Sequence, residues 1–266
     1  MTSSAGLSCG FTLALGGGGG RGWAHIGVAR ALDEAGLRPG AIVGTSMGAI
    51  VGAGMAAGVT AREMERLAGE ISVFRVVGRG AHFALFDPRP LLERLRPVLR
   101  DPLIEELPLP LAVSAFDLVA GRPAAITSGR LFDALQRSIA VPLLFPPTAA
   151  DGGVWCDAGP WEAVPVSLAR SFSAAPAVAA LLRGLGERLG TGDAADRLTA
   201  RRYLALLATR WADPVHAEAP DLLIRPRLGR TPSWQFASVG RMVELGYRDA
   251  RAAILEAGLS AERHAA

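Results

Sequence analysis

The stretch LALGGGGGRGWAH, residues 13–25, places five glycines between a short apolar run and a run with helical periodicity. Glycine loses more backbone entropy on folding than any other residue, so five in a row need a reason. A flexible linker is a poor one, because linkers seldom lie between a strand and its own crossover helix. We therefore expect the backbone to come very close to another group here.

The neighbouring segments alternate between strand and helix patterns. Residues 11–15 and 41–46 are short apolar runs typical of buried strands, and residues 23–37 and 47–58 have helical patterns. This alternation predicts an α/β fold with a mostly parallel central sheet and crossover helices. Further strands are expected at 109–118, 124–129, 154–156 and 221–226, and further helices at 131–140 and 239–254. No tandem repeat or linker is evident, so we predict a single domain over residues 1–266.

Composition excludes several classes of protein. Half of the 266 residues are apolar and 20% are charged, which argues against disorder. All 28 basic residues are arginine, which excludes a Schiff-base lysine and the lysine of a P-loop. The net charge is +3 and the arginines are scattered, so we expect no nucleic-acid partner.

Cysteines and histidines give no sign of a metal or cofactor site. Cys9 and Cys156 form no CxxC pair, and the four histidines lack metal-ligand spacing. We expect neither a metal nor a cofactor. The N-terminus lacks the basic region of a signal peptide, and no apolar run reaches 18 residues. These features predict a cytoplasmic protein without a membrane span.

The glycine run fits a dinucleotide-binding fingerprint at Gly17, Gly19 and Gly22. That interpretation also needs an acidic residue at the end of the second strand, to hold a ribose. Thr45 and Ser46 stand there instead. The dinucleotide hypothesis is therefore the weaker one.

The second strand ends in Gly44-Thr45-Ser46-Met47-Gly48, a GxSxG motif at a strand-to-helix junction. This context is typical of a nucleophile elbow, a turn so sharp that its flanking positions must be glycine. We therefore predict that Ser46 is a nucleophile, supported by Gly44 and Gly48.

The glycine loop should lie beside Ser46, because adjacent parallel strands present their carboxyl ends at one edge of the sheet. Amides without Cβ atoms can approach an oxyanion closely. Gly18 and Gly19 are the first candidates for oxyanion-hole donors, and Gly17 is next. Arg21 either binds an anionic head group or pairs with a surface acid.

The general base is not decided by these patterns. His216 and His264 are the histidines late enough for a Ser-acid-His order, and neither lies in a motif. His25 falls in the first crossover helix, where a packing or capping role is expected.

The segments LALGGGGGRGWAHIGVARALDEAGL, GTSMGAIVGA, ALQRSIAVPLLFPP and DGGVWCDAGPWEAVPVSLAR, taken together, resemble the patatin-like phospholipases. The resemblance extends to DLLIRP and ELGYRDA and so covers nearly the whole chain. It implies a three-layer α/β/α sandwich and a lipid acyl hydrolase, either phospholipase A-like or a broader carboxylesterase. The family uses a Ser-Asp dyad without histidine. The resemblance therefore implies Ser46 as nucleophile, Gly17, Gly18 and Gly19 with Arg21 and Gly22 as the oxyanion loop, and an aspartate of a DGG or DGA motif as base.

Two aspartates compete for the role of base. Asp151 begins an Asp-Gly-Gly sequence that matches the family's letters, whereas Asp157 is followed by Ala158 and Gly159. The resemblance favours Asp157, because in the family this motif follows a short strand and comes shortly before a Pro-Val pair, as Asp157 does here. Asp-Gly is also a common hairpin turn, so we interpret Asp151 as the turn before that strand. A free aspartate has a pKa of about 3.9, so Asp157 would need burial to become an effective base.

Ala158 and Pro160 depart from the family pattern at this motif. If position 158 needs a positive φ, alanine there costs about 1 kcal/mol. These departures motivate an alternative function, a catalytically impaired member that binds lipid or a partner in a regulatory role.

Residues 73–86 mix apolar side chains with arginines. They form a candidate lid or interfacial segment, and the alternative is an ordinary core helix. The expected partners are a lipid or ester substrate and a membrane surface contacted peripherally. The oligomeric state is left open.

Overall fold

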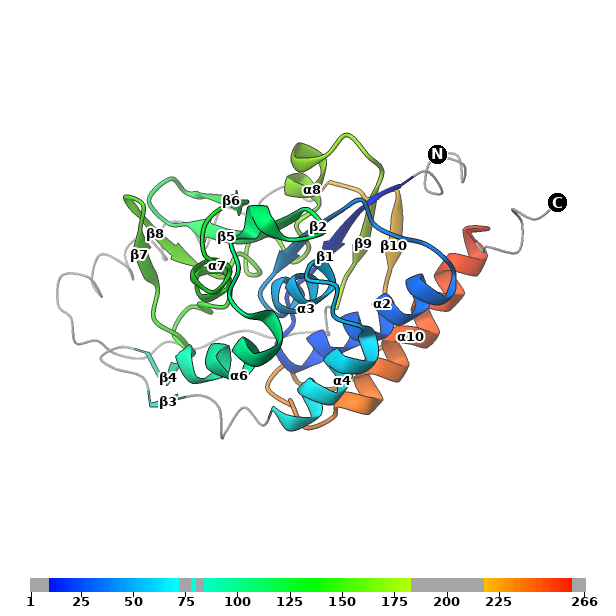
Figure 1. Cartoon of the computed structure of the whole chain (residues 1–266), viewed down its shortest axis with the longest axis horizontal. Coiled ribbons are helices and arrows are strands. Elements are labelled where there is room, and N and C mark those ends of the chain that lie inside the picture. The colour runs from blue at the N-terminus through cyan, green and yellow to red at the C-terminus, as the bar shows by residue number, and fades with distance from the viewer. Residues whose placement is uncertain (1–9, 72–77, 80–83, 183–217, 260–266) are drawn as a thin grey trace.

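The computed structural model describes residues 10–71, 78–79, 84–182 and 218–259 (Figure 1). Its centre is an eight-stranded sheet in the order β10-β9-β1-β2-β5-β8-β7, with β6 also paired to β5. All neighbours from β10 to β5 are parallel, whereas β6, β7 and β8 pair antiparallel. The strands are β1 (Thr12–Leu15), β2 (Ala41–Thr45), β5 (Leu111–Asp117), β6 (Arg122–Ile126), β7 (Thr148–Ala150), β8 (Gly153–Cys156), β9 (Ala177–Ala180) and β10 (Leu222–Ile224).

Helices cover both faces of this sheet, which confirms the predicted α/β architecture with a mostly parallel sheet (Figure 1). The helices are α2 (Ala24–Glu34), α3 (Met47–Ala56), α4 (Ala61–Glu70), α6 (Arg89–Leu99), α7 (Leu131–Ser138), α8 (Val166–Phe172) and α10 (Val239–Glu256), with 3-10 turns η1 (Gly19–Trp23) and η2 (Ile104–Glu106). None of the helices in the described ranges is both long enough and apolar enough to cross a bilayer.

Alternation along the strands divides the core into two layers. Leu13 and Leu15 of β1 belong to the large cluster that packs against α2, α3, α4, α6, α7 and α10. Ala14, between them, belongs to a second cluster with Val166 and Ala169 of α8. Successive residues of a strand face opposite sides, so one strand contributes to both layers. The same alternation at β2, β5 and β9 produces the three-layer sandwich.

Most predicted elements are found within a few residues of their expected bounds. The expected helix from residue 23 begins instead with the 3-10 turn η1, which carries the last glycines of the loop. Of the candidate lid at 73–86, residues 73–77 and 80–83 lie outside the described residues. The described part includes β3 (Gly78–Arg79), which pairs antiparallel with β4 (Phe86–Asp87).

Candidate active site

Ser46 lies at a sharp turn between β2 and α3. Its backbone has φ 55° and ψ −123°, a conformation that non-glycine residues adopt only under strain. A Cβ on Gly44 would lie 2.6 Å from the Cα of Ala49, and one on Gly48 would lie 2.6 Å from the carbonyl oxygen of Gly16. Both flanking positions therefore require glycine, as the elbow prediction expected. The turn leaves Ser46 at the carboxyl end of β2, with the first amides of α3 behind it.

Asp157 lies near Ser46 because β2 and β8 pair with successive parts of β5 and run in opposite directions. Thr45 of β2 pairs with Ser114, and Cys156 of β8 pairs antiparallel with Phe116. The next residue of each strand, Ser46 or Asp157, therefore comes level with Ala115. The Ser46 side chain lies close enough to the Asp157 carboxyl for its hydroxyl to act on the pKa of that group as a hydrogen-bond donor. The structure thus brings together the two residues that sequence reasoning paired.

Burial changes the acid-base character of Asp157. The residue is 3% exposed, and desolvation raises the pKa of its carboxyl from 3.8 to about 6. Hydrogen bonds from the Ser46 hydroxyl and the Gly159 amide oppose this rise by stabilising the charged form. The Gly159 amide lies 2.7 Å from Oδ1. A carboxylate with a raised pKa accepts a proton more readily than a free aspartate does.

The competing aspartate, Asp151, lies elsewhere. It occupies the turn between β7 and β8, where Asp151 has φ 53° and Gly152 has φ 75°. Its carboxylate is largely exposed and forms an ion pair with Arg137 at 2.6 Å. Asp151 therefore forms the hairpin turn expected from Asp-Gly, and its side chain interacts with Arg137 of α7.

Ala158 fits its position without backbone strain. It is fully buried, and it is absent from the described residues that have a positive φ. Beside it, the rings of Phe116 and Trp161 stack with centroids 3.9 Å apart. The concern that alanine is unsuited to this motif therefore does not apply to the observed conformation.

The glycine loop passes directly beside Ser46. A Cβ on Gly17 would lie 3.4 Å from the Ser46 Cβ. The Gly17 amide donates to the Ala163 carbonyl at 3.1 Å, so it is not available to an oxyanion in this conformation. Within the described residues, no hydrogen bond from the amide of Gly18 or Gly19 is present. Within the glycine loop, the candidate hydrogen-bond donors to an oxyanion are therefore the amides of Gly18 and Gly19.

Met47 was not named as a site residue from the sequence alone. The signal that could have found it is its place directly after the serine of the GxSxG motif. Its amide is the first of α3 and has no intrahelical partner, since the first amides of a helix never do. The residue after the serine of a GxSxG elbow commonly supplies an oxyanion donor. Gly22 lies against it, because a Cβ there would collide with the Met47 side chain.

Arg21 is 6% exposed, and its Nη1 lies 3.5 Å from the Leu182 carbonyl oxygen. This contact links the glycine loop to the chain that follows β9. Arg21 is therefore not at the surface, where pairing with a surface acid would place it.

His25, for which the sequence predicted a packing or capping role, packs inside the protein. It is fully buried, and its Nε2 lies 2.8 Å from the carbonyl oxygen of Gly16. A carbonyl only accepts, so Nε2 carries the proton and donates. Burial lowers the pKa of His25 to about 4. His25 is therefore neutral near pH 7 and holds the start of the glycine loop. His216 and His264 lie outside the described residues.

Ser138, at the end of α7, also contacts the elbow. Its Oγ accepts from the Ser46 amide at 2.8 Å and donates to the Ser114 carbonyl at 2.6 Å. Nothing in the sequence pattern of α7 singles out this residue, because the contact depends on strand order.

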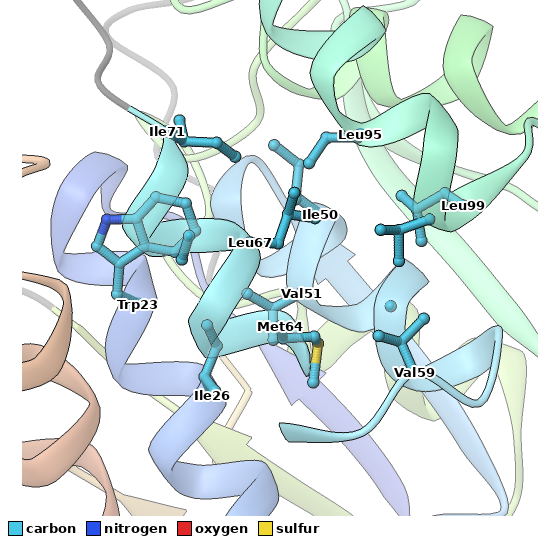
Figure 2. Close-up of a pocket in the computed structure, with 13 residues that line it drawn as sticks. Trp23, Ile26, Ile50, Val51, Val59, Met64, Leu67, Ile71, Leu95 and Leu99 are labelled. Carbon is cyan, nitrogen blue, oxygen red and sulfur yellow. The ribbon is translucent and has the colours of Figure 1, made fainter. Parts of the chain in front are cut away.

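A small apolar cavity lies within the helical layer. Figure 2 shows its walls, which come from η1, α2, α3, α4 and α6. Its volume is about 30 Å³, close to the space of one water molecule. Neither Ser46 nor Asp157 lines it, and it is too small for an acyl chain. Labelled lining residues are Trp23, Ile26, Ile50, Val51, Val59, Met64, Leu67, Ile71, Leu95 and Leu99.

Metal ligands are not gathered at this site. Among residues 10–71, 78–79, 84–182 and 218–259, no three His, Cys, Asp or Glu side chains lie close enough to hold an ion. The described polar groups of the site are instead a hydroxyl, a carboxylate and backbone amides. Such a set suits nucleophilic attack on a carbonyl carbon.

Comparisons with known proteins agree on one family. The model of the patatin-like phospholipase family matches residues 13–170. An uncharacterised NTE family protein of Mycobacterium tuberculosis is 34% identical over 176 residues, which cover 65% of this chain and 49% of that protein. The human patatin-like phospholipase domain-containing protein 6 is 30% identical over 219 residues, 79% of this chain and 16% of that protein.

Two further matches extend this picture. Lysophospholipase NTE1 of Mycosarcoma maydis is 32% identical over 181 residues, covering 64% of this chain and 9% of that protein. The crystal structure of VipD from Legionella pneumophila superposes with a TM-score of 0.61 at 15% identity, over 93% of this chain and 67% of that one. The latter supports the fold. The chain spans about half the length of the mycobacterial relative and less of the eukaryotic ones.

Proposed function

Because this chain belongs to the patatin-like phospholipase family, we propose that it is a serine lipid acyl hydrolase, phospholipase A-like or a broader carboxylesterase. The observation that carries this proposal is the approach of the Ser46 hydroxyl to the buried Asp157 carboxylate, beside the amides of Gly18 and Gly19, which have no partner among the described residues. In this proposal Ser46 is the nucleophile and Asp157 is the base.

The reaction begins when Ser46 Oγ attacks the ester carbonyl carbon and Asp157 accepts the hydroxyl proton. The carbonyl π electrons move onto oxygen, which becomes the oxyanion of a tetrahedral intermediate. The amides of Gly18, Gly19 and Met47 are the donors proposed for that oxygen. Each preorganised donor of this kind is worth about 3 kcal/mol of barrier.

The intermediate collapses when the bond from the carbonyl carbon to the leaving oxygen breaks. Asp157 returns its proton to that oxygen, so an alcohol or lysolipid departs and an acyl-Ser46 ester remains. Water then attacks this ester while Asp157 again accepts a proton. The bond from the carbonyl carbon to Ser46 Oγ then breaks, Asp157 returns its proton to Oγ, and the acid product leaves.

Electrostatics favour Asp157 for this double role. With a pKa near 6, the carboxyl is mostly ionised at pH 7, yet it binds a proton far more readily than an aspartate in water. Thus the burial that destabilises the charged form also makes Asp157 a better base.

The alternative function is a catalytically impaired member that binds lipid or a partner. Ala158 and Pro160 motivate it, and the absence of a positive φ at Ala158 removes the backbone argument for that residue. A fluorophosphonate probe separates the two functions. An active hydrolase labels at Ser46, whereas an impaired member that retains only binding does not.

The experiment that tests the proposed function is hydrolysis of a panel of phospholipids, lysophospholipids and p-nitrophenyl esters. We expect wild type to release acid from at least one class of ester and Ser46→Ala to release none. Ser171→Ala, which changes an exposed serine of α8, is the matched control and should behave as wild type. Equal rates in wild type and Ser46→Ala would contradict the proposal.

For localisation, we propose a cytoplasmic protein that contacts membranes peripherally. Trp234 is 66% exposed, and its neighbour Ser233 accepts a hydrogen bond from the Gly20 amide at 2.6 Å. An exposed tryptophan thus lies next to the glycine loop, and tryptophan favours membrane interfaces.

Co-sedimentation with phospholipid vesicles tests this contact. Trp234→Ala should bind vesicles more weakly than wild type. Leu255→Ala is the control, since Leu255 is also more than half exposed but lies near the end of α10. Equal binding by the Trp234→Ala variant and wild type would exclude Trp234 as a membrane contact.

A further inference from the structure

Ser138 joins the nucleophile to the neighbouring strand. Its Oγ lies 2.8 Å from the Ser46 amide nitrogen and 2.6 Å from the Ser114 carbonyl oxygen. All three residues are buried, and Ser138 and Ser114 have no exposed surface. The hydroxyl lies just beyond Thr45 and Ser114, the last residues that pair β2 with β5. It therefore bridges the two strands at the point where β2 turns into the elbow.

The direction of this chain of hydrogen bonds is fixed. The Ser46 amide only donates and the Ser114 carbonyl only accepts, so the Ser138 hydroxyl must accept from the first and donate to the second. A hydroxyl that does both is held in one orientation. Hydrogen bonds in such a chain also polarise one another, which strengthens each of them in a buried site.

The remaining backbone group of Ser46 is held from the other side. Its carbonyl accepts from the Ala49 amide at 2.9 Å and from the Ile50 amide at 3.2 Å, at the start of α3. The strained φ of Ser46 persists only while surrounding contacts over-determine it. The Ser138 hydroxyl supplies the contact to the Ser46 amide. Without it, the peptide between Thr45 and Ser46 can rotate and carry Oγ with it.

The segment just after Ser138 contacts the backbone of Asp157. The Ala140 carbonyl accepts from the Asp157 amide at 3.0 Å. The segment 138–140 thus contacts the backbone of both Ser46 and Asp157. This segment, at and just after the end of α7, therefore bears on the separation of the two groups.

We propose that Ser138 is a positioning residue that sets the orientation of Ser46 toward Asp157 and the substrate carbonyl by holding the Ser46 amide. This inference rests on the proposed hydrolase function. Ser138 itself takes no part in proton transfer, because its single proton is committed to the Ser114 carbonyl.

A pair of isosteric variants isolates the hydroxyl. Ser138→Thr retains it and Ser138→Val replaces it with a methyl group of similar volume, so both add the same bulk. Ser138→Ala removes the hydroxyl without added bulk. Thr12→Val is the matched control. Thr12 is also fully buried in the sheet, but it lies at the start of β1, at the end away from the glycine loop. Its hydroxyl has no hydrogen-bond partner among the described residues.

The measurement is kcat and KM on a p-nitrophenyl ester, with active sites counted by fluorophosphonate labelling. We expect Ser138→Ala and Ser138→Val to lower kcat by about 10- to 100-fold with little change in KM, because misorientation affects the reacting geometry. Ser138→Thr should recover most of the kcat lost in Ser138→Val. Thr12→Val should keep the wild-type kcat.

The outcomes separate the two proposals. A wild type without Ser46-dependent hydrolysis contradicts the proposed function and this inference with it. An active wild type with equal kcat in Ser138→Val and Ser138→Thr contradicts the positioning role alone. Failure of all three Ser138 variants to fold would make Ser138 a folding residue and would equally overturn it.

Discussion

Ser46 and Asp157 meet level with Ala115 of β5, because Ser46 follows the partner of Ser114 and Asp157 follows the partner of Phe116. The hydroxyl and the carboxylate therefore come from strands that run in opposite directions. Their contact depends on β5 being longer than β2, which leaves room for β8 at its end.

The first prediction concerns the stability cost of the buried carboxylate. Because the folded-state pKa of Asp157 is raised from 3.8 to about 6, the folded protein binds a proton there more readily than the unfolded chain. This contribution to stability is present below about pH 4 and is lost as pH rises through about 6. Asp157→Asn should therefore gain up to about 3 kcal/mol relative to wild type between pH 4 and pH 8.

Urea denaturation at several pH values measures this difference. Asp151→Asn is the control, because Asp151 lies in an exposed turn. A stability difference between Asp157→Asn and wild type that stays constant with pH would contradict the assigned burial.

The second prediction concerns the strained elbow. Ser46→Ala and Ser46→Gly both remove the hydroxyl, but only glycine adopts φ 55° and ψ −123° without steric cost. We expect Ser46→Gly to be more stable than Ser46→Ala by about 1 kcal/mol, although glycine also gains entropy in the unfolded chain. Thermal or chemical denaturation of both variants tests this, and a more stable Ser46→Ala would argue against the strained conformation.

The elbow and the architecture around it could be predicted from sequence because their signals are local. Gly44, Ser46 and Gly48 lie within five positions, and the strand and helix patterns on either side fix their context. The choice of Asp157 over Asp151 rested on the family's placement of the motif and on local chemistry, since Asp-Gly forms the turn that the structure contains.

The contacts that depend on strand order could not be predicted in this way. The partner of the Gly17 amide is Ala163, and the partner of the Ser46 amide is Ser138. His25 was expected to pack or cap, and its contact with Gly16, nine residues earlier in the chain, is seen only in the folded structure. Tertiary packing brings each of these pairs together, so the spacing of the residues in the sequence does not predict the contact.

The third prediction concerns the approach of the elbow to the glycine loop. A Cβ on Gly48 would meet the Gly16 carbonyl oxygen at 2.6 Å, and that oxygen belongs to backbone that cannot easily move. Gly48→Ala should cost about 1–3 kcal/mol of stability and displace the loop, with a large loss of hydrolysis. Gly69→Ala in α4 meets nothing within 4 Å and should be neutral or stabilising by up to about 1 kcal/mol. Similar behaviour of the two variants would contradict the close packing.

The fourth prediction concerns histidine. A dyad of serine and aspartate needs no imidazole, so His216→Ala should hydrolyse esters at the wild-type rate. The comparison is made on the same p-nitrophenyl ester with active sites counted by labelling. Loss of activity in His216→Ala would contradict the dyad and indicate a triad that includes His216.

The decisive measurement is the pH dependence of kcat/KM for an uncharged ester, compared among wild type, Asp157→Asn and Asp151→Asn. We predict that wild type and Asp151→Asn gain activity with rising pH through about 6 and then reach a plateau. Asp157→Asn should lose about 10²- to 10⁴-fold in rate and show no such limb. A variant Asp157→Asn that keeps both the wild-type rate and the limb near pH 6 would contradict the assignment of Asp157 as the base.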